Sequence, residues 1–119
     1  MSHEATARAY YRAIDAADDD ALADLLAPGF AHDRPDRTLS GRETFVRFMR
    51  EERPRTDTEH RIDAVYVESA DANAEPEVAV RGRLLGDDGG ELFGFVDVFE
   101  FANGDDADAT VDHLTTYTD

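Results

Sequence analysis

The first half of the chain places its hydrophobic residues with the spacing of helices. From residue 7 onward, apolar side chains recur at intervals of three and four, which predicts a helix over about 2–17. The run Asp18–Asp20 supplies an N-cap and acidic first turn for a shorter second helix, which Pro28-Gly29 should end. Ser40–Glu43 matches a capping box, so a third helix is expected to begin there and to end before Pro54.

The second half of the chain alternates apolar and polar residues with the period of strands. Four segments, 60–69, 77–86, 91–101 and 109–118, show this pattern and are separated by turn-rich stretches. The earlier segment "FAHDRPDR" is interrupted by Pro35 and predicts an edge strand or an extended loop. Helices followed by antiparallel strands indicate an α+β fold, and no repeat or linker divides it, so one domain over 1–119 is expected.

The net charge of the chain says more about its binding partners than about its fold. The chain has 28 acidic residues and 12 basic ones, a formal net charge of −16, and every basic residue is arginine. This composition is similar to that of proteins from extreme halophiles, and we expect molar salt to stabilise the chain by screening its self-repulsion. Nucleic acids and anionic membranes are not expected as partners. With no cysteine, no membrane-length apolar run and no recognisable leader, a cytoplasmic protein is expected.

The strand predicted over 91–101 contains a carboxylate in unusual surroundings. Because side chains alternate between two faces, Phe93, Phe95, Phe99 and Phe101 share one face with Asp97. Desolvation by such neighbours disfavours the charged form, so the pKa of Asp97 should be raised. One interpretation is a neutral acid that donates a hydrogen bond to a ligand. The other is that Asp97 binds a backbone group or an arginine and stabilises the sheet.

Three stretches, "YYRAIDAADDDALADLLAPGF", "HDRPDRTLSGRETFVRFM" and "DVFEFANG", resemble the nuclear transport factor 2-like superfamily. This superfamily includes ketosteroid isomerases and SnoaL-like polyketide cyclases. The resemblance implies a cone in which three N-terminal helices pack on a curved, mainly antiparallel sheet of four to five strands. It also implies a cavity between the helices and the sheet, and a second sheet face directed toward a partner subunit. The fold hosts many unrelated functions, so the reaction does not follow from it.

The resemblance also implies roles for particular residues. It places Asp97 where the isomerases keep a protonated aspartate that donates to an oxyanion, and Tyr10 where their second oxyanion donor lies. Tyr11 points about 100° away from Tyr10 on a helix, so only one of the two is expected to face the cavity. The alternative is that both tyrosines are ordinary core residues.

The segment "AHDRP" departs from the isomerase pattern. Directly before Pro35, where the isomerases place their proton-abstracting aspartate, the chain has Arg34, which stays protonated and cannot act as a base. Asp33 is one residue away and should face the other side of the strand. Ketosteroid isomerase activity is therefore not expected. His32 shares the face of Arg34, and the pair suits a carboxylate or an enolate, unless Arg34 instead neutralises Asp97 or a surface acid.

The last strand carries one further candidate base. Val111, His113, Thr115 and Tyr117 share a face, and by the family alignment this face lines the cavity. His113 is then a candidate general base, since histidine titrates near neutral pH, although a structural role is the alternative. Tyr117 and Phe95 are expected to contact the substrate. No ligand spacing for a metal is present, and neither a metal nor a cofactor is expected.

Two functions remain open at this stage. The chain is either a cofactor-independent isomerase, cyclase or hydratase acting on an apolar carbonyl compound, or a non-catalytic ligand-binding or dimerisation module. Leu92, Val96 and Val98 make the reverse face of the Asp97 strand apolar as well. A sheet that is apolar on both faces needs a second cover, so a homodimer through the sheet is expected, with a small-molecule ligand in the cone.

Overall fold

The three predicted helices are present. The computed structural model describes residues 2–51, 58–68, 77–101 and 110–119. Within these ranges the helices are α1 (His3–Asp15), α2 (Asp19–Asp24) and α3 (Arg42–Glu51). The side chains of Ser2 and Asp18 cap α1 and α2 by accepting hydrogen bonds from backbone N–H groups of the first turn, at 3.0 and 3.1 Å. The cap at Asp18 confirms the predicted start of α2, whereas Ser40, predicted to cap the third helix, ends β2 and α3 begins at Arg42.

The described residues also form one mixed sheet of six strands. These are β1 (Leu26–Asp33), β2 (Thr38–Ser40), β3 (Glu59–Val67), β4 (Val78–Leu85), β5 (Glu91–Phe101) and β6 (Val111–Thr118). They lie in the order β2-β1-β6-β5-β4-β3. β1 runs parallel to β6, and the four other neighbouring pairs are antiparallel. The first strand thus joins the last one and brings distant parts of the sequence together.

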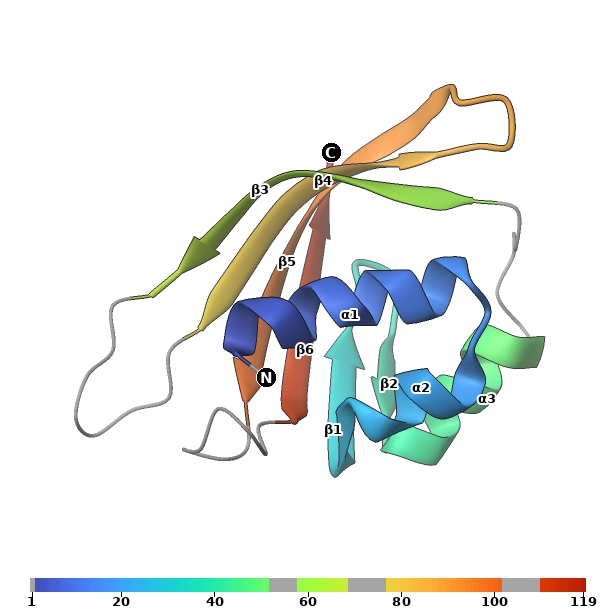
Figure 1. The fold of residues 1–119 in the computed structure, drawn as a ribbon. Helices are drawn as coiled ribbons and strands as arrows, with labels where there is room; N and C mark the ends of the chain where they lie inside the picture. The colour runs from blue at the N-terminus through green and yellow to red at the C-terminus, as the bar shows by residue number, and fades with distance from the viewer. Residues whose placement is uncertain (1, 52–57, 69–76, 102–109) are drawn as a thin grey trace.

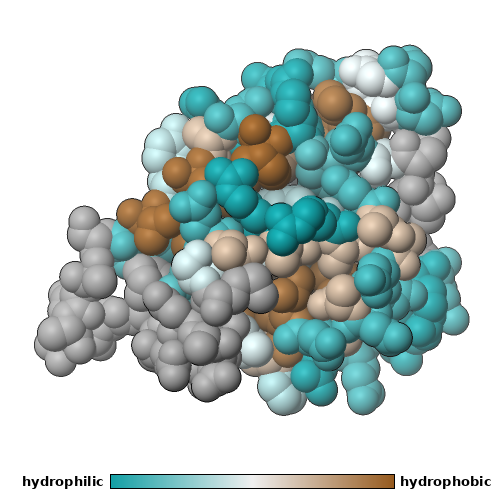
Figure 2. Space-filling model, in the orientation of Figure 1, coloured by the Kyte–Doolittle hydropathy of each residue, from teal (hydrophilic) through white to brown (hydrophobic). Residues whose placement is uncertain are grey.

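The helices cover one face of the curved sheet (Figure 1). α1 crosses beneath β3 and β4, while α2 and α3 lie beside β1 and β2. The core lies between these two layers and includes Tyr10, Tyr11, Phe30, Phe45, Val80, Phe99 and Leu114, each at most 3 % exposed. Figure 2 shows that hydrophilic residues dominate the surface in this view, with hydrophobic residues emerging between them. No helix in the described ranges is long and apolar enough to cross a membrane.

The sheet is larger than the four to five strands predicted, because Thr38–Ser40 forms a further strand, β2, at its edge. The segment predicted as an edge strand or loop lies in β1, which is paired on both sides, with β2 and β6. The strand β1 also begins earlier than expected. Leu25 already caps α2, and the chain continues from Leu26 as a strand instead of ending a helix at Pro28. Between Leu26 and Ala31 the pairing with β6 shifts register. Pro28 lies in this irregular part, where its missing N–H costs no regular ladder hydrogen bond.

Candidate functional site

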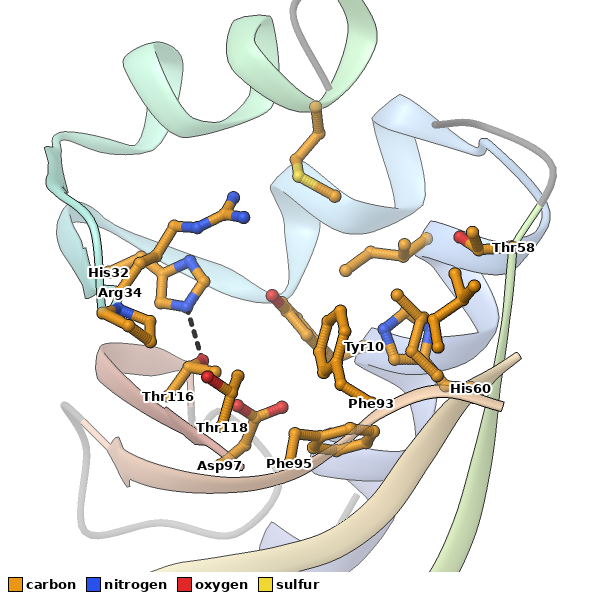
Figure 3. Close-up of a pocket in the computed structure, with 15 residues that line it drawn as sticks. Tyr10, His32, Arg34, Thr58, His60, Phe93, Phe95, Asp97, Thr116 and Thr118 are labelled. Atoms are coloured by element: carbon orange, nitrogen blue, oxygen red, sulfur yellow. Dashed lines mark hydrogen bonds between the residues drawn. The ribbon is translucent and has the colours of Figure 1, made fainter. Parts of the chain in front are cut away.

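A cavity of about 260 Å³ lies between α1, the turn after β1 and the inner face of the sheet (Figure 3). Apolar side chains form much of its wall: Ile14, Met49, Leu84, Leu92, Phe93 and Phe95. The polar side chains that reach it are Tyr10, His32, Arg34, Thr58, His60, Asp97, Thr116 and Thr118. An apolar cavity with a few polar groups is typical of sites for small molecules.

Asp97 lies on the inner face of β5 and is only 5 % exposed. Phe95 and Phe99 flank it on the same face, as the alternation of the strand predicts. Tyr11 donates to its Oδ2 at 2.6 Å and Thr116 donates to its Oδ1 at 2.5 Å. Burial raises the pKa of the Asp97 carboxyl, and these two hydrogen bonds act against the rise. The pKa shift therefore has the expected direction, and hydroxyl groups rather than an arginine hold the carboxyl.

The two adjacent tyrosines of α1 have different roles: one lines the cavity and the other binds Asp97. Both are 3 % exposed, but Tyr10 lines the cavity whereas Tyr11 binds Asp97. Their rings meet edge to face at 5.2 Å, and each also contacts Phe99. Burial, together with the charge of Asp97, raises the pKa of Tyr11, so its hydroxyl remains a donor.

His32 is connected to Asp97 through a single hydroxyl group. On β1 it is 6 % exposed, and its Nε2 lies 2.7 Å from Thr116 Oγ1 (Figure 3). Its other ring nitrogen, Nδ1, is buried and has no hydrogen-bond partner in the described part of the chain. Burial and the nearby charge of Arg34 lower the pKa of His32 to about 3. The ring is therefore neutral at physiological pH.

His60 and Asp15 form a second polar pair at the cavity. His60 is the second residue of β3 and lines the cavity, and its Nδ1 lies 2.7 Å from Asp15 Oδ1 at the end of α1. The backbone N–H of His60 also donates to Asp15 Oδ2 at 3.1 Å, so the carboxylate is held at both oxygens. The ring packs between Tyr11 and Phe95, at centroid distances of 5.1 and 5.6 Å. The contact with Asp15 thus uses Nδ1 and leaves Nε2 for other contacts.

Arg34 brings a positive charge to the same cavity. It follows β1, and its guanidinium carbon lies 5.1 Å from the centre of the Phe48 ring. Its Nε is 3.7 Å from Asp36 Oδ1, and its side chain is 27 % exposed. The side chain lies next to His32 (Figure 3), as predicted for two residues on one face. A partly exposed guanidinium in an apolar cavity can bind a carboxylate or an oxyanion.

The prediction that His113 and Tyr117 line the cavity is wrong. In the β5–β6 pairing Asp97 lies opposite Thr116, so the inward side chains of β6 are those of even number from Leu114 onward. His113 and Tyr117 do not line the cavity, and Tyr117 is 59 % exposed. His113 Nε2 instead lies 2.7 Å from Asp33 Oδ2, and the hydrogen bonds of Thr38 and His113 lower the pKa of this carboxyl.

A register shift explains the error. Val111 is fully buried, but the pairing changes between Glu100 and Phe101, directly before His113. One extra residue on one strand moves the following side chains to the opposite face. Alternation counted from Val111 therefore assigns the wrong face to the rest of β6.

Sequence reasoning also missed residues that the site uses. Tyr11, Thr116 and the pair of His60 with Asp15 had no assigned role, whereas Asp97, Tyr10, His32, Arg34 and Phe95 do line the cavity. Counting inward positions onward from Leu114 would have found Thr116, but nothing in the sequence relates Asp15 to His60. Within the described residues, no three histidine, aspartate or glutamate side chains are grouped to hold a metal ion.

A curved sheet folded over helices around a cavity defines an α+β cone of the nuclear transport factor 2-like, or cystatin-like, kind. Nuclear transport factor 2 from Cryptosporidium parvum has this fold, with a TM-score of 0.77 and 19% identity over 98% of this chain and 90% of that one. The model of the SnoaL-like domain matches residues 7–108, and the chain belongs to this family.

Two further solved structures share the fold at low identity. A candidate polyketide cyclase from Sinorhizobium meliloti has a TM-score of 0.74 and 16% identity, over 94% of this chain and 93% of that one. A candidate isomerase of the SnoaL-like family from Agrobacterium tumefaciens has a TM-score of 0.73 and 15% identity, over 98% and 97%. No curated protein matches the sequence. The solved structures establish the fold and the SnoaL-like domain match establishes the family, and the reaction has to be argued from the cavity.

Proposed function

We propose that this protein is a cofactor-independent enzyme that transfers protons on an apolar carbonyl compound, as an isomerase or a cyclase does. The observation that carries the proposal is the convergence of His60, Arg34, His32 and Asp97 on one largely apolar cavity. His32 and Asp97 have shifted pKa values, and such groups in an apolar cavity are typical of acid–base sites. The chemistry is abstraction of a proton next to a carbonyl group, with the negative charge moving to the oxygen.

His60 is the base in this proposal. Asp15 accepts the hydrogen bond of Nδ1–H at 2.7 Å, which fixes the tautomer with the lone pair on Nε2 and stabilises the cation formed when Nε2 takes a proton. This role passes to His60 from His113, which lies outside the cavity. Arg34 and the neutral His32, at the other side of the cavity in Figure 3, would bind the oxygen that becomes negative.

Exchange of carbonyl-adjacent protons in heavy water tests the proposal without knowledge of the natural substrate. We expect the protein to accelerate this exchange for 4-oxo-4-phenylbutanoate, an aryl ketone whose carbonyl oxygen Arg34 and His32 would bind, as followed by proton NMR. His60→Gln should slow the protein-catalysed exchange about 100-fold, because the base is lost. His113→Gln is the matched control and should leave the rate unchanged, since His113 lies outside the cavity.

The non-catalytic alternative rests on one observation. Arg34 stands directly before Pro35, where the isomerases that the sequence resembles place their catalytic aspartate. A protein that binds the ketone but exchanges its protons no faster than buffer, with or without His60, would favour a ligand-binding module and contradict the enzyme proposal.

We also propose that the outer face of the sheet forms a homodimer. Val96 and Tyr117 lie opposite each other on neighbouring strands and are 37 % and 59 % exposed. Tyr66 adds a third exposed hydrophobic residue, at 55 %. Light scattering in high salt should give the mass of a dimer, and Tyr117→Asp should give a folded monomer because it places charge in the apolar contact. A monomeric wild-type protein would contradict this proposal.

A further inference from the structure

Thr116 connects two ionisable side chains through one hydroxyl group. It donates to Asp97 Oδ1 at 2.5 Å and lies 2.7 Å from His32 Nε2. A threonine hydroxyl has a single proton, so while it donates to Asp97 it must accept the hydrogen bond from His32 Nε2–H. This places the lone pair of the ring on Nδ1, which is buried without a partner among the described residues.

The hydrogen bonds between Asp97, Thr116 and His32 can also be donated in the opposite direction. When Asp97 is protonated on Oδ1 it can donate to Thr116, and Thr116 then donates to His32 Nε2. The ring proton is now on Nδ1. His32 Nδ1 is therefore an acceptor when Asp97 is ionised and a donor when Asp97 is neutral, while the ring itself stays neutral in both states. The low pKa of His32, about 3, agrees with a ring that never carries a charge at neutral pH.

We propose that His32, Thr116 and Asp97 form a proton relay between the buried carboxyl and a ligand oxygen bound at His32 Nδ1 beside Arg34. The ligand hydroxyl gives its proton to His32 Nδ1, and His32 Nε2–H gives its proton to Thr116 Oγ1. The proton that Thr116 carried before the transfer passes to Asp97 Oδ1. One ligand O–H bond is broken and one carboxyl O–H bond is formed. The ligand becomes an oxyanion that accepts a hydrogen bond from Nδ1–H.

The surroundings of the relay select the class of ligand. Figure 3 shows the His32 ring between Thr116 and Arg34, so an oxygen at Nδ1 lies close to the guanidinium charge. Enols and phenols fit this place, because their hydroxyl groups are acidic enough to share a proton with a carboxyl and their carbon skeletons suit the apolar walls. This assignment rests on the proposed function, since it names the ligand class of the same cavity. Proton abstraction by His60 would give an enolate, which is the oxyanion that such an enol forms when it gives its hydroxyl proton to the relay.

The first experiment needs no ligand. Nitrogen-15 and carbon-13 NMR at constant high salt should show the His32 ring changing from the Nε2–H to the Nδ1–H tautomer at the pH where the Asp97 carboxyl takes up its proton. Asp97→Asn should hold the Nδ1–H tautomer at every pH, because an amide N–H donates permanently to Thr116. Thr116→Ser should keep the coincidence of the two titrations, and Thr116→Val should abolish it.

Other charged groups near the relay must be followed in the same spectra. The groups that act electrostatically on Asp97 are Tyr11 on α1, His60 on β3 and Arg34, and those that act on His32 are Arg34, Asp36, Asp33 and His113. A tautomer change that follows the titration of His113 or His60 instead of Asp97 would overturn the relay. So would a coincidence of the Asp97 and His32 titrations that persists in Thr116→Val.

The second experiment uses 4-nitrophenol, whose absorption reports whether it is bound as the phenol or the phenolate. Binding should convert it to the phenolate while the Asp97 carboxyl resonance moves to its neutral position. Thr116→Val should weaken binding about tenfold, as expected for one lost hydrogen-bond connection, and Thr116→Ser should match wild type. Failure of 4-nitrophenol to bind would overturn the ligand class. Because neither experiment requires turnover, the relay can hold in a protein that fails the proton-exchange test, and the two outcomes are separable.

Discussion

Asp97→Ala is expected to lower the free energy of unfolding by about 3 kcal/mol at neutral pH, whereas Asp97→Asn should retain the fold. Alanine leaves the buried hydroxyl groups of Tyr11 and Thr116 without their shared acceptor and opens a small void between Phe95 and Phe99. Asparagine fills the space and can accept from one hydroxyl group and donate to the other. Urea unfolding of the variants at one high salt concentration measures the difference.

The difference in the free energy of unfolding between Asp97→Asn and wild type should depend on pH. Since burial raises the pKa of Asp97 in the folded state, its contribution to stability is fully present below the unfolded pKa of about 3.9 and is lost as the pH rises through the folded pKa. The stability of Asp97→Asn relative to wild type should therefore improve across that pH window. An Asn variant as unstable as the Ala variant at neutral pH would show that Asp97 acts as an ionised anchor. Wild-type stability of Asp97→Ala would show that the hydroxyl contacts contribute nothing.

Gly82→Ala is expected to destabilise the protein by about 3 kcal/mol and to disturb the cavity. A Cβ atom on Gly82 would lie 2.3 Å from the backbone oxygen of Arg61 and 2.8 Å from Phe95 Cζ. The carbonyl belongs to the pairing of β3 with β4, so relief would break a ladder or displace the Phe95 ring. Phe95 contacts His60, and its movement should appear as changed NMR shifts of the His60 ring.

Gly29→Ala is the matched control for Gly82→Ala. Nothing lies within 4 Å of an added Cβ at Gly29, and its φ is not in the left-handed region. Urea unfolding should therefore show a change within about 0.5 kcal/mol of wild type. Equal stability of the two glycine variants would contradict the close packing of β4 against Phe95 and Arg61.

Local signals in the sequence were sufficient for the three helices, the four long strands and the polar residue of β5. Helix caps at Ser2 and Asp18 act within a single turn, and the strand 91–101 has the predicted bounds. Alternation alone placed Asp97 among phenylalanines and gave the direction of its pKa shift. These features depend on residues only a few positions apart, so they can be predicted from the local sequence.

Tertiary structure decided which groups meet at the cavity. Tyr11 reaches Asp97 across 86 positions of sequence, His32 reaches Thr116 across 84, and Asp15 reaches His60 across 45. The irregularity in β6 that turns His113 outward is likewise a property of pairing between two strands. The sequence by itself thus determined the α+β class, the start of α2 and a desolvated carboxyl on β5, and its resemblance to a known superfamily implied the cone. Only the register of the strands and the packing of α1 decided the partners of that carboxyl, because contacts between distant segments depend on how the whole sheet is paired.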